Sequence, residues 1–237
     1  INKYLSKKKI QKVINCAGII DFDKCERNFK QILKINYQLP KFLSKMSIKY
    51  NFRFIHISTD HVYNGNKKKI HSENDKVFGI NKYAKSKILA EKAVRLNKKN
   101  LIIRTNFTGR KKNKKISFLD SVILNLKKKH KISLFNDMYT STIDVKTCAT
   151  LIVKLILLNA SGIYNIGSKD VISKQDFIIN FAKRMKKKLN FDSVSSDVLK
   201  VKRGKNLGMN VTKIENKLNI KMPTSKKVIN NLVKEYI

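Results

Sequence analysis

FRFIHIS, residues Phe52–Ser58, is a short run of mostly apolar residues that ends at a hydroxyl side chain. Such a run is typical of a strand buried on both faces of a sheet. Four other runs share this pattern: Lys12–Cys16, Leu101–Thr105, Ile132–Leu134 and Gly162–Ile166. Because longer segments of helical period separate these runs, the chain is predicted to be an α/β protein with a doubly wound parallel sheet.

Segments of helical period alternate with these strands. They are Asp23–Lys49, Asn81–Asn97, Ser117–His130, Asp144–Leu158, Ser173–Lys188 and Lys226–Tyr236. Asp144 and Ser173 each precede the apolar part of a helix, where an N-cap side chain is expected. The elements become shorter from residue 135 onward. We therefore expect residues 1–134 to form the main domain and residues 135–237 a smaller lobe, some of whose elements return to the sheet.

The net charge of +37 raises the question of a polyanionic partner. Of the 53 basic residues, seven are Arg, which leaves 46 Lys. Nucleic-acid readers usually enrich Arg, because its planar guanidinium pairs bidentately with phosphate and guanine. The lysines are spread over nearly every segment, and A/T-rich codons favour Lys, Asn and Ile together. We expect no specific nucleic acid partner; the alternative, a nucleic-acid-binding protein, predicts one contiguous basic face with interleaved aromatic residues.

The three cysteines, Cys16, Cys25 and Cys148, lack the spacing of a disulfide framework or a zinc site. We therefore expect no bound metal, and a reducing cytoplasm is the expected compartment. The most apolar run, Cys148–Leu158, is too short to span a bilayer and contains Lys154, so no membrane span is expected.

Tyr83 and Lys87 lie four residues apart on a predicted helix, so their side chains share a face. A neighbouring ammonium stabilises a phenolate, and we expect Lys87 to lower the pKa of Tyr83 toward the operating pH. The spacing alone is weak evidence in a lysine-rich chain, because Tyr37 and Lys41 repeat it.

Thr59 stands at the carboxyl end of the predicted strand Phe52–Ser58. Ligands of a doubly wound sheet bind beyond the carboxyl ends of its strands. Thr59 could there bond a substrate carbonyl oxygen while Tyr83 supplies a proton. The alternative for Ser58, Thr59 and Asp60 is a strand-end turn capped by its own side chains.

Six segments, in the same order along the chain, resemble those of one known family. They are Val13–Gly18 (VINCAG), His56–Gly65 (HISTDHVYNG), Asn81–Glu91 (NKYAKSKILAE), Ile103–Phe107 (IRTNF), Ser161–Gly167 (SGIYNIG) and Asn206–Pro223. On these residues the chain resembles the dTDP-4-dehydrorhamnose reductases, which are extended short-chain dehydrogenases/reductases. The resemblance implies a Rossmann-like fold, with a partial dinucleotide-binding domain in residues 1–134 and a mainly substrate-binding lobe in residues 135–237.

The resemblance also implies an activity, the NAD(P)H-dependent reduction of the 4-keto group of a nucleotide-linked deoxysugar in deoxysugar or surface-polysaccharide biosynthesis. Tyr83 is implied to donate the proton, Thr59 to orient the oxygen that receives it, and Lys87 to hold the nicotinamide ribose. The residues implied to bind NADP or NAD are Asn15, Cys16, Ala17, Gly18, Tyr83 and Lys87. Those implied to face the sugar are Asp60, His61, Asn106 and Phe107. Asn36 is implied to support the active-site strand.

The chain departs from the family pattern at its start. The family has a Gly-x-x-Gly-x-x-Gly loop in its first strand–helix turn, and none of the eight glycines here has that spacing. The sequence thus predicts an N-terminally incomplete Rossmann-like domain, either a fragment or a natural truncation. Because the phosphate-cradling loop is missing from these residues, we expect weak or no NAD(P)H binding and an inactive chain when they are tested alone.

Two alternatives within the resemblance stay open. One is an epimerase or dehydratase of the same superfamily. The other is a non-catalytic relative that regulates a partner enzyme, against which the presence of Thr59, Tyr83 and Lys87 argues. The implied partners are a nucleotide-sugar substrate and, as a possible assembly, a second copy of the chain.

Overall fold

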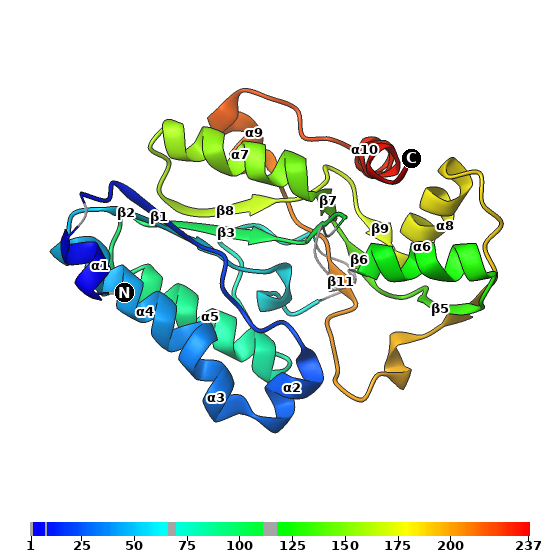
Figure 1. Ribbon diagram of the computed structural model, residues 1–237, viewed down its shortest axis with the longest axis horizontal. Helices are drawn as coiled ribbons and strands as arrows, with labels where there is room; N and C mark the ends of the chain where they lie inside the picture. Colours follow the sequence, from blue (N-terminus) through cyan, green and yellow to red (C-terminus); the bar gives the residue numbers. More distant parts are fainter. Residues whose placement is uncertain (1, 8, 66–69, 111–117) are drawn as a thin grey trace.

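A parallel sheet forms the centre of the computed structural model, which describes residues 2–7, 9–65, 70–110 and 118–237. Within these ranges the sheet has the order β1-β2-β3-β8. Its strands are β1 (Lys12–Asn15), β2 (Arg53–Ile57), β3 (Leu101–Thr105) and β8 (Gly162–Ile166). All pair in parallel, so their carboxyl ends meet at one edge (Figure 1). The predicted α/β fold with a parallel sheet is confirmed.

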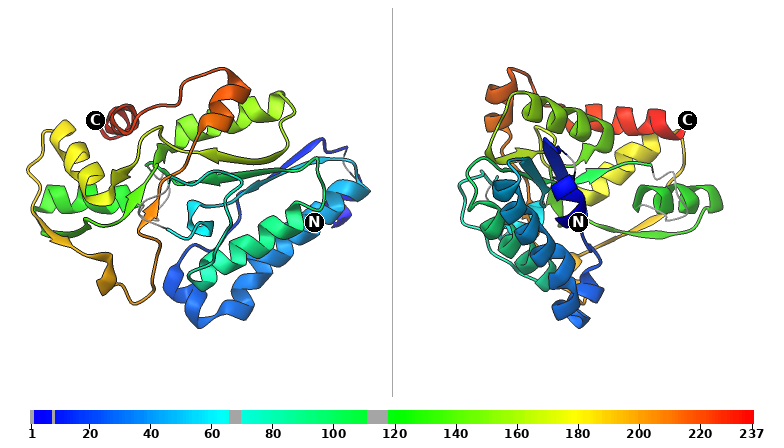
Figure 2. Two further views of the ribbon diagram at one scale, coloured as in Figure 1. Left: turned by 180° about the vertical axis from the view of Figure 1, so that it is seen from behind. Right: turned by 60° about the vertical axis from the view of Figure 1, so that its left-hand side comes forward.

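Helices cover both faces of this sheet, as the views from two sides show (Figures 1 and 2). On one face lie α4 (Leu39–Lys49) and α5 (Lys82–Val94), and on the other lies α7 (Val145–Leu157). Successive strand residues point to opposite faces. Phe54 accordingly packs in the cluster with Leu43 and Val94, whereas Ile55 packs with Leu151 and Leu155. This two-sided burial explains why the neighbouring residues Phe54 and Ile55 are both apolar.

Shorter elements follow β3 and form the part of the molecule that carries α6 (Phe118–Lys128), α8 (Lys174–Arg184), α9 (Thr212–Leu218) and α10 (Ser225–Tyr236). Their strands pair as β5 (Ile132–Phe135) with β10 (Phe191–Val194), and as β4 (Phe107–Thr108) with β7 (Ile143–Asp144). A small sheet joins β6 (Tyr139–Thr140), β9 (Ile172–Ser173) and β11 (Asn206–Leu207). Since α7 and β8 belong to the central layers, the division at residue 134 stays a prediction.

The region between β1 and β2 differs from its prediction. A single helix over Asp23–Lys49 was expected, but the structure has α2 (Phe22–Arg27), α3 (Phe29–Leu33), a π-helical turn η1 (Lys34–Gln38) and α4. Asn28 interrupts the first part with non-helical angles (φ −123°, ψ 46°). Pro40 has no amide hydrogen for an ordinary helical bond, and the amide of Leu39 donates to the carbonyl of Lys34, five residues back. The single-helix prediction was therefore wrong.

The other predicted elements are confirmed to within a few residues, although Ser117 lies outside the described ranges. Both predicted caps form: Asp144 accepts the amide of Thr147, and Ser173 that of Asp176, each over 2.9 Å. The strands of two residues were not predicted, because so short a run shows no periodicity. Helix α1 (Asn2–Lys7) and the 3₁₀ turns η2 (Asp60–Val62) and η3 (Ser196–Val198) complete the fold.

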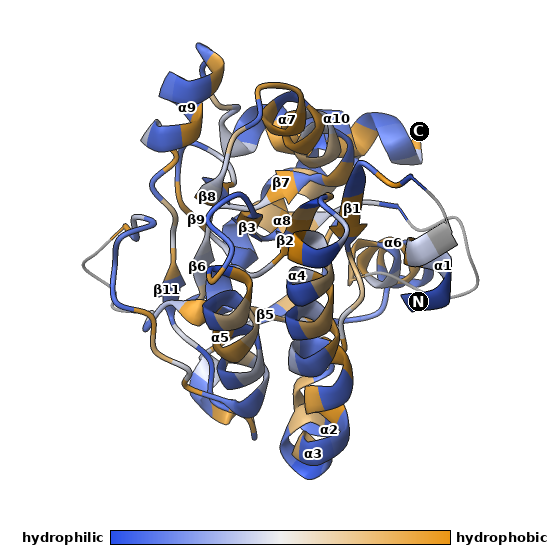
Figure 3. Ribbon diagram, turned by 90° about the vertical axis from the view of Figure 1, so that its left-hand side faces the viewer, coloured by the Kyte–Doolittle hydropathy of each residue, from blue (hydrophilic) through white to orange (hydrophobic). Residues whose placement is uncertain are grey.

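Hydropathy colouring shows mixed polar and apolar surfaces on α4 and α5, as expected for helices that cover one face of a sheet (Figure 3). In the part of the chain that the structure describes, none of the helices combines the length and apolar character that a membrane crossing needs.

Candidate active site

A cavity of about 310 Å³ lies at the carboxyl ends of β1, β2 and β3. Its lining combines segments that are far apart in the sequence. The lining residues are Cys16, Ala17, Gly18, Ile20, Phe22, Ile57, Ser58, Thr59, Asp60, His61, Tyr83, Lys87, Thr105, Asn106, Phe107 and Lys174. Most of the residues singled out from the sequence are thus brought together in one place, where a doubly wound sheet binds its ligands.

Tyr83 lies in the first turn of α5, which Asn81 caps by accepting the amide of Ala84 over 2.9 Å. The ring of Phe22 contacts that of Tyr83 edge to face, with 5.1 Å between centroids. Burial raises the pKa of the Tyr83 phenol; a hydrogen bond with Thr59 lowers it only in part, and the charge of Asp60 raises it further. The expectation that Lys87 brings this pKa down was therefore wrong: burial dominates.

Lys87 is buried one helical turn after Tyr83. Its ammonium donates to the carbonyl of Ile57 over 2.7 Å and lies 3.4 Å from Nε2 of His56. Burial lowers the pKa of Lys87 to about 8, while Glu91 and Cys16 act in the opposite direction. The helix therefore fixes Lys87 on the end of β2, at the floor of the cavity, with its ammonium bonded to the strand.

Thr59 caps the turn η2 and also lines the cavity. Its hydroxyl oxygen accepts the amide of His61 over 3.2 Å and so caps the short turn η2. The same hydroxyl donates to Asp60 Oδ1 over 3.1 Å, and its presence beside Tyr83 partly lowers the pKa of that phenol. The strand-end turn capped by its own side chains is therefore present, and it places Thr59 beside Tyr83.

The turn after β1 lines the cavity through Cys16, Ala17 and Gly18. Asn15 was expected to bind the cofactor, but it is not among the residues that line the cavity. Its side chain accepts the amide of Ala17 over 3.1 Å and contacts Nδ1 of the buried His56 at 3.3 Å, so Asn15 holds the turn from behind.

Asn36 lies in the π-helical turn and is buried. Its amide group bonds both backbone groups of Ile19, accepting from the nitrogen over 2.8 Å and donating to the oxygen over 2.9 Å. It also donates to the hydroxyl of Ser86 over 3.0 Å. Asn36 thus joins the loop after β1 to helix α5, and it supports the loop, not the strand that was expected.

The four residues expected to face a sugar all line the cavity. Asn106 donates to Asp60 Oδ2 over 2.8 Å and to the hydroxyl of Thr140 over 3.0 Å. Burial lowers the pKa of His61 to about 4, with Asp60 opposing it, so this imidazole is neutral at neutral pH. Phe107 is half exposed at the rim. These four residues therefore offer one buried carboxylate, neutral donors and an apolar edge.

A buried polar network braces the strand end beneath the site. Glu91 accepts from the hydroxyl of Ser58 and pairs with Arg104, whose Nη2 lies 2.7 Å from its Oε2. Arg104 in turn donates to the hydroxyl of Tyr63 over 3.1 Å. Because the pair is buried, the loss of either partner would leave an uncompensated charge.

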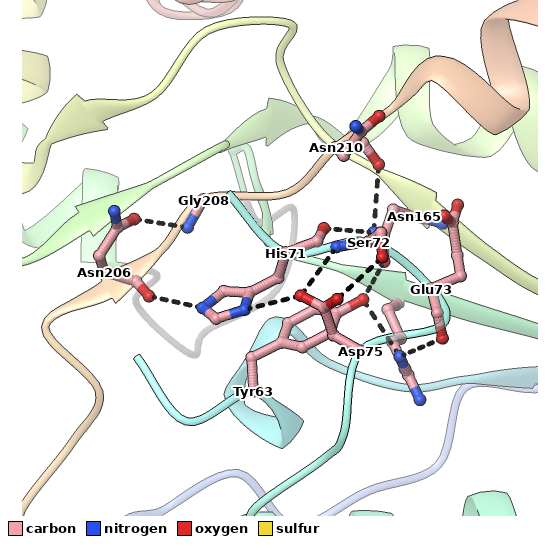
Figure 4. Close-up of polar contacts among 10 residues, drawn as sticks. Tyr63, His71, Ser72, Glu73, Asp75, Asn165, Asn206, Gly208 and Asn210 are labelled. Carbon is pink, nitrogen blue, oxygen red and sulfur yellow. Dashed lines mark hydrogen bonds and ion pairs between the residues drawn. The ribbon is translucent and has the colours of Figure 1, made fainter. Parts of the chain in front are cut away.

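The network continues into the C-terminal part, as Figure 4 shows. The ring of Tyr63 stacks on that of His71, with 4.7 Å between centroids, and its hydroxyl donates to Asn165 over 2.7 Å. His71 contacts Asp75 at 3.3 Å and the carbonyl of Asn206 at 3.2 Å. These contacts tie the loop after β2 to β8 and to the segment around β11.

Sequence reasoning missed several lining residues, among them Phe22 and Lys174. Phe22 follows the cap Asp21 and carries no local sign of a ligand site. Lys174 is one lysine among many and reaches the cavity only because α8 starts next to it. Among the residues that the structure describes, there is no group of three or more metal-ligating side chains that could hold an ion.

Comparisons with known proteins identify relatives of this chain. The family model of the RmlD substrate binding domain matches residues 1–237. A probable low-salt glycan biosynthesis reductase of Haloferax volcanii is 30% identical over 169 residues, which are 70% of this chain and 56% of that protein. A spore coat polysaccharide biosynthesis protein of Bacillus subtilis is 27% identical over 166 residues, 70% of this chain and 58% of that protein. The chain thus spans less than two thirds of the length of these curated relatives.

Solved structures share the fold. The dTDP-4-dehydrorhamnose reductase of Bacillus anthracis, determined in complex with NADP, superposes with a TM-score of 0.92 at 23% identity. The match covers 98% of this chain and 83% of that one. At this identity the likeness shows that the two chains have the same Rossmann-like architecture.

Proposed function

The chain belongs to the RmlD substrate-binding domain family, and on this premise we propose that it carries the proton-transfer site of a sugar-nucleotide reductase. The proposed reaction is the NAD(P)H-dependent reduction of the 4-keto group of a nucleotide-linked deoxysugar. One observation carries the proposal: Thr59, Tyr83 and Lys87 line the same cavity at the carboxyl ends of the strands.

The pKa directions suit reduction. A ketone that accepts hydride becomes an alkoxide, a strong base that needs a proton donor within reach. Burial keeps the Tyr83 phenol protonated at neutral pH, so Tyr83 is ready to donate. Thr59 positions the oxygen that receives the proton, and the neighbouring neutral His61 adds no competing charge.

The residues at the nicotinamide end of the site fit a dinucleotide. Cys16, Ala17 and Gly18 offer small side chains in the lining of the cavity, and Lys87 and Tyr83 offer donors for ribose hydroxyls. When bound, NADPH or NADH supplies the hydride. We propose that Lys87, held by the carbonyl of Ile57, orients the ribose beside Tyr83.

The names of the relatives support a role in glycan synthesis. The Haloferax volcanii protein is described as a glycan biosynthesis reductase and the Bacillus subtilis protein as acting in spore coat polysaccharide biosynthesis. We propose the same class of pathway here, with dTDP-4-dehydrorhamnose as the first substrate to test.

Replacing Tyr83 with Phe tests the mechanism. The change removes the donated proton and little volume, so we expect turnover of dTDP-4-dehydrorhamnose to fall by about 10²- to 10⁴-fold. The measurement is NADPH oxidation by the full protein as its gene encodes it. Tyr37→Phe is the matched control, because Tyr37 precedes Lys41 with the same spacing and the ammonium of Lys41 lies over its ring, 5.5 Å from the centroid.

Binding separates a catalytic loss from a structural one. Tyr83→Phe should bind dTDP with wild-type affinity, since the phenol contacts the reacting sugar and not the nucleotide. Wild-type turnover in Tyr83→Phe would contradict the proposal. An equal loss in Tyr37→Phe would do the same.

A further inference from the structure

A second cavity of about 400 Å³ adjoins the catalytic one. The two share Asn106, Phe107 and Lys174 in their linings. The second cavity contains four aromatic rings, from Phe107, Phe118, Phe135 and Phe177, together with the hydroxyls of Ser133, Thr140 and Thr142. Apolar and aromatic walls with a few polar groups are typical of small-molecule sites.

Two cations lie at this junction of the two cavities. Lys174 lines both cavities, and Arg203 lines the second while its guanidinium lies over the ring of Phe22, 4.2 Å from the centroid. Phe22 itself lines the first cavity. Across the ranges that the structure describes, neither cation has a carboxylate oxygen within ion-pair distance, and Nε of Arg203 is buried without a hydrogen-bond partner.

The surroundings of Lys174 and Arg203 disfavour the charged form of both side chains. Burial lowers the pKa of Lys174, Asp60 offsets this in part, and repulsion by Arg203 lowers it further. Burial also lowers the pKa of Arg203, with a partial offset from Asp23. Lys174 and Arg203 are both partly buried, and a cation that is partly removed from water is stabilised when an anion pairs with it. Other lysines of the chain, such as Lys183 and Lys186, are exposed, so their charges stay hydrated.

We propose that Lys174 and Arg203 bind the diphosphate of the nucleotide-linked sugar, with the sugar in the catalytic cavity and the nucleoside in the aromatic one. The inference rests on the proposed function, which places the sugar beside Tyr83. A nucleoside diphosphate sugar has its diphosphate between base and sugar, and the unpaired cations lie between the two cavities in the same order. A guanidinium pairs bidentately with phosphate oxygens, and an ammonium acts as a point charge.

The test is the affinity for dTDP measured by calorimetry, which requires no hydride transfer. We expect Lys174→Met and Arg203→Met each to weaken binding by about tenfold or more, because each removes a charge-assisted bond. The matched controls are Lys183→Met and Arg184→Met, which remove the same charges from exposed positions on α8. These should change the affinity by less than about twofold, which separates the site from the general attraction of a chain of charge +37.

Lys174→Arg keeps the cation and should bind dTDP within about threefold of wild type. Thermal unfolding identifies variants that fold. Unchanged affinity in a folded Lys174→Met or Arg203→Met variant would overturn the inference, and so would an equal loss in the exposed controls. The proposed function fails separately: if dTDP affinity depends on Lys174 while Tyr83→Phe retains turnover, the diphosphate site stands and the reductase mechanism falls.

Discussion

At the scale of single residues, burial decides the chemistry of the site. Tyr83 and Lys87 share a helix face, but their pKa values move for the same reason: each side chain is removed from water. Removal from water favours the neutral form, which raises the pKa of a phenol and lowers that of an amine. The Lys87 charge that the spacing suggested is not among the influences on the pKa of Tyr83. Burial of the Lys87 ammonium therefore lowers the free energy of unfolding of the protein.

This cost predicts a pH-dependent stability. Between pH 8 and 10.5 the unfolded chain keeps the proton on Lys87 while the folded chain has released it, so this group's contribution to stability rises with pH across that window. Below pH 8 the full penalty is present. Lys87→Met should then raise the free energy of unfolding at pH 7 by about 2 kcal/mol, after about 1 kcal/mol is lost with the bond to Ile57.

Urea unfolding at pH 7 and pH 11 measures the effect, and the gain from Lys87→Met should shrink at the higher pH. Lys85→Met, on the exposed side of the same helix, is the control and should show no such change between the two values. A gain that is absent, or that is equal at both pH values, would contradict a burial penalty on Lys87.

At the scale of elements, the π-helical turn η1 connects parts of the site. The turn arises next to Pro40, whose missing amide shifts the bonding of the helix before α4. It contains Asn36, which satisfies both backbone groups of Ile19 and also reaches Ser86. The loop that forms one wall of the cavity is therefore held to α5, the helix that carries Tyr83 and Lys87.

Asn36→Ala should release this loop. Two part-buried backbone groups of Ile19 would lose their partners, at a cost of about 2 kcal/mol in the free energy of unfolding. Hydrogen exchange at the amide of Ile19 should accelerate by about tenfold or more. Ser86→Ala removes only the third bond and serves as the control, with exchange at Ile19 near the wild-type rate. Unchanged exchange in Asn36→Ala would show that the loop is held by other contacts.

At the scale of the whole molecule, the sheet brings the reacting side chains to one edge, and the smaller strands add a second cavity beside it. In the proposed function, the described residues form walls for a nicotinamide and a sugar nucleotide. None of the eight glycines has the spacing of a phosphate-binding loop.

We therefore expect these 237 residues alone to bind NADPH with millimolar affinity or weaker, because phosphate contacts supply much of a dinucleotide's binding energy. Fluorescence titration of NADPH measures this, at moderate salt to suppress the nonspecific attraction of the basic surface. dTDP, whose proposed contacts all lie within the chain, is the positive control. Micromolar NADPH binding would contradict the prediction.

The sequence alone determined the central strands, the covering helices and most of the cavity residues, because each depends on short-range patterns. Alternating apolar runs predicted the layers, and hydroxyls at the end of FRFIHIS placed Thr59 at the ligand-binding edge. The cap at Asp144 followed from local chemistry in the same way. The break of the predicted helix after Asp23 did not follow from local chemistry, since it depends on how Asn28 and Pro40 are accommodated against neighbouring elements.

Tertiary structure alone decided what each site residue experiences. The pKa of Tyr83 rises because packing buries it, and burial cannot be read from a spacing of four residues. Lys174 and Arg203 meet at the junction of two cavities, although 29 residues separate them and each is one of 53 basic residues. Their unpaired charges are a property of long-range contacts, which is why the pattern of the sequence gave no sign of them.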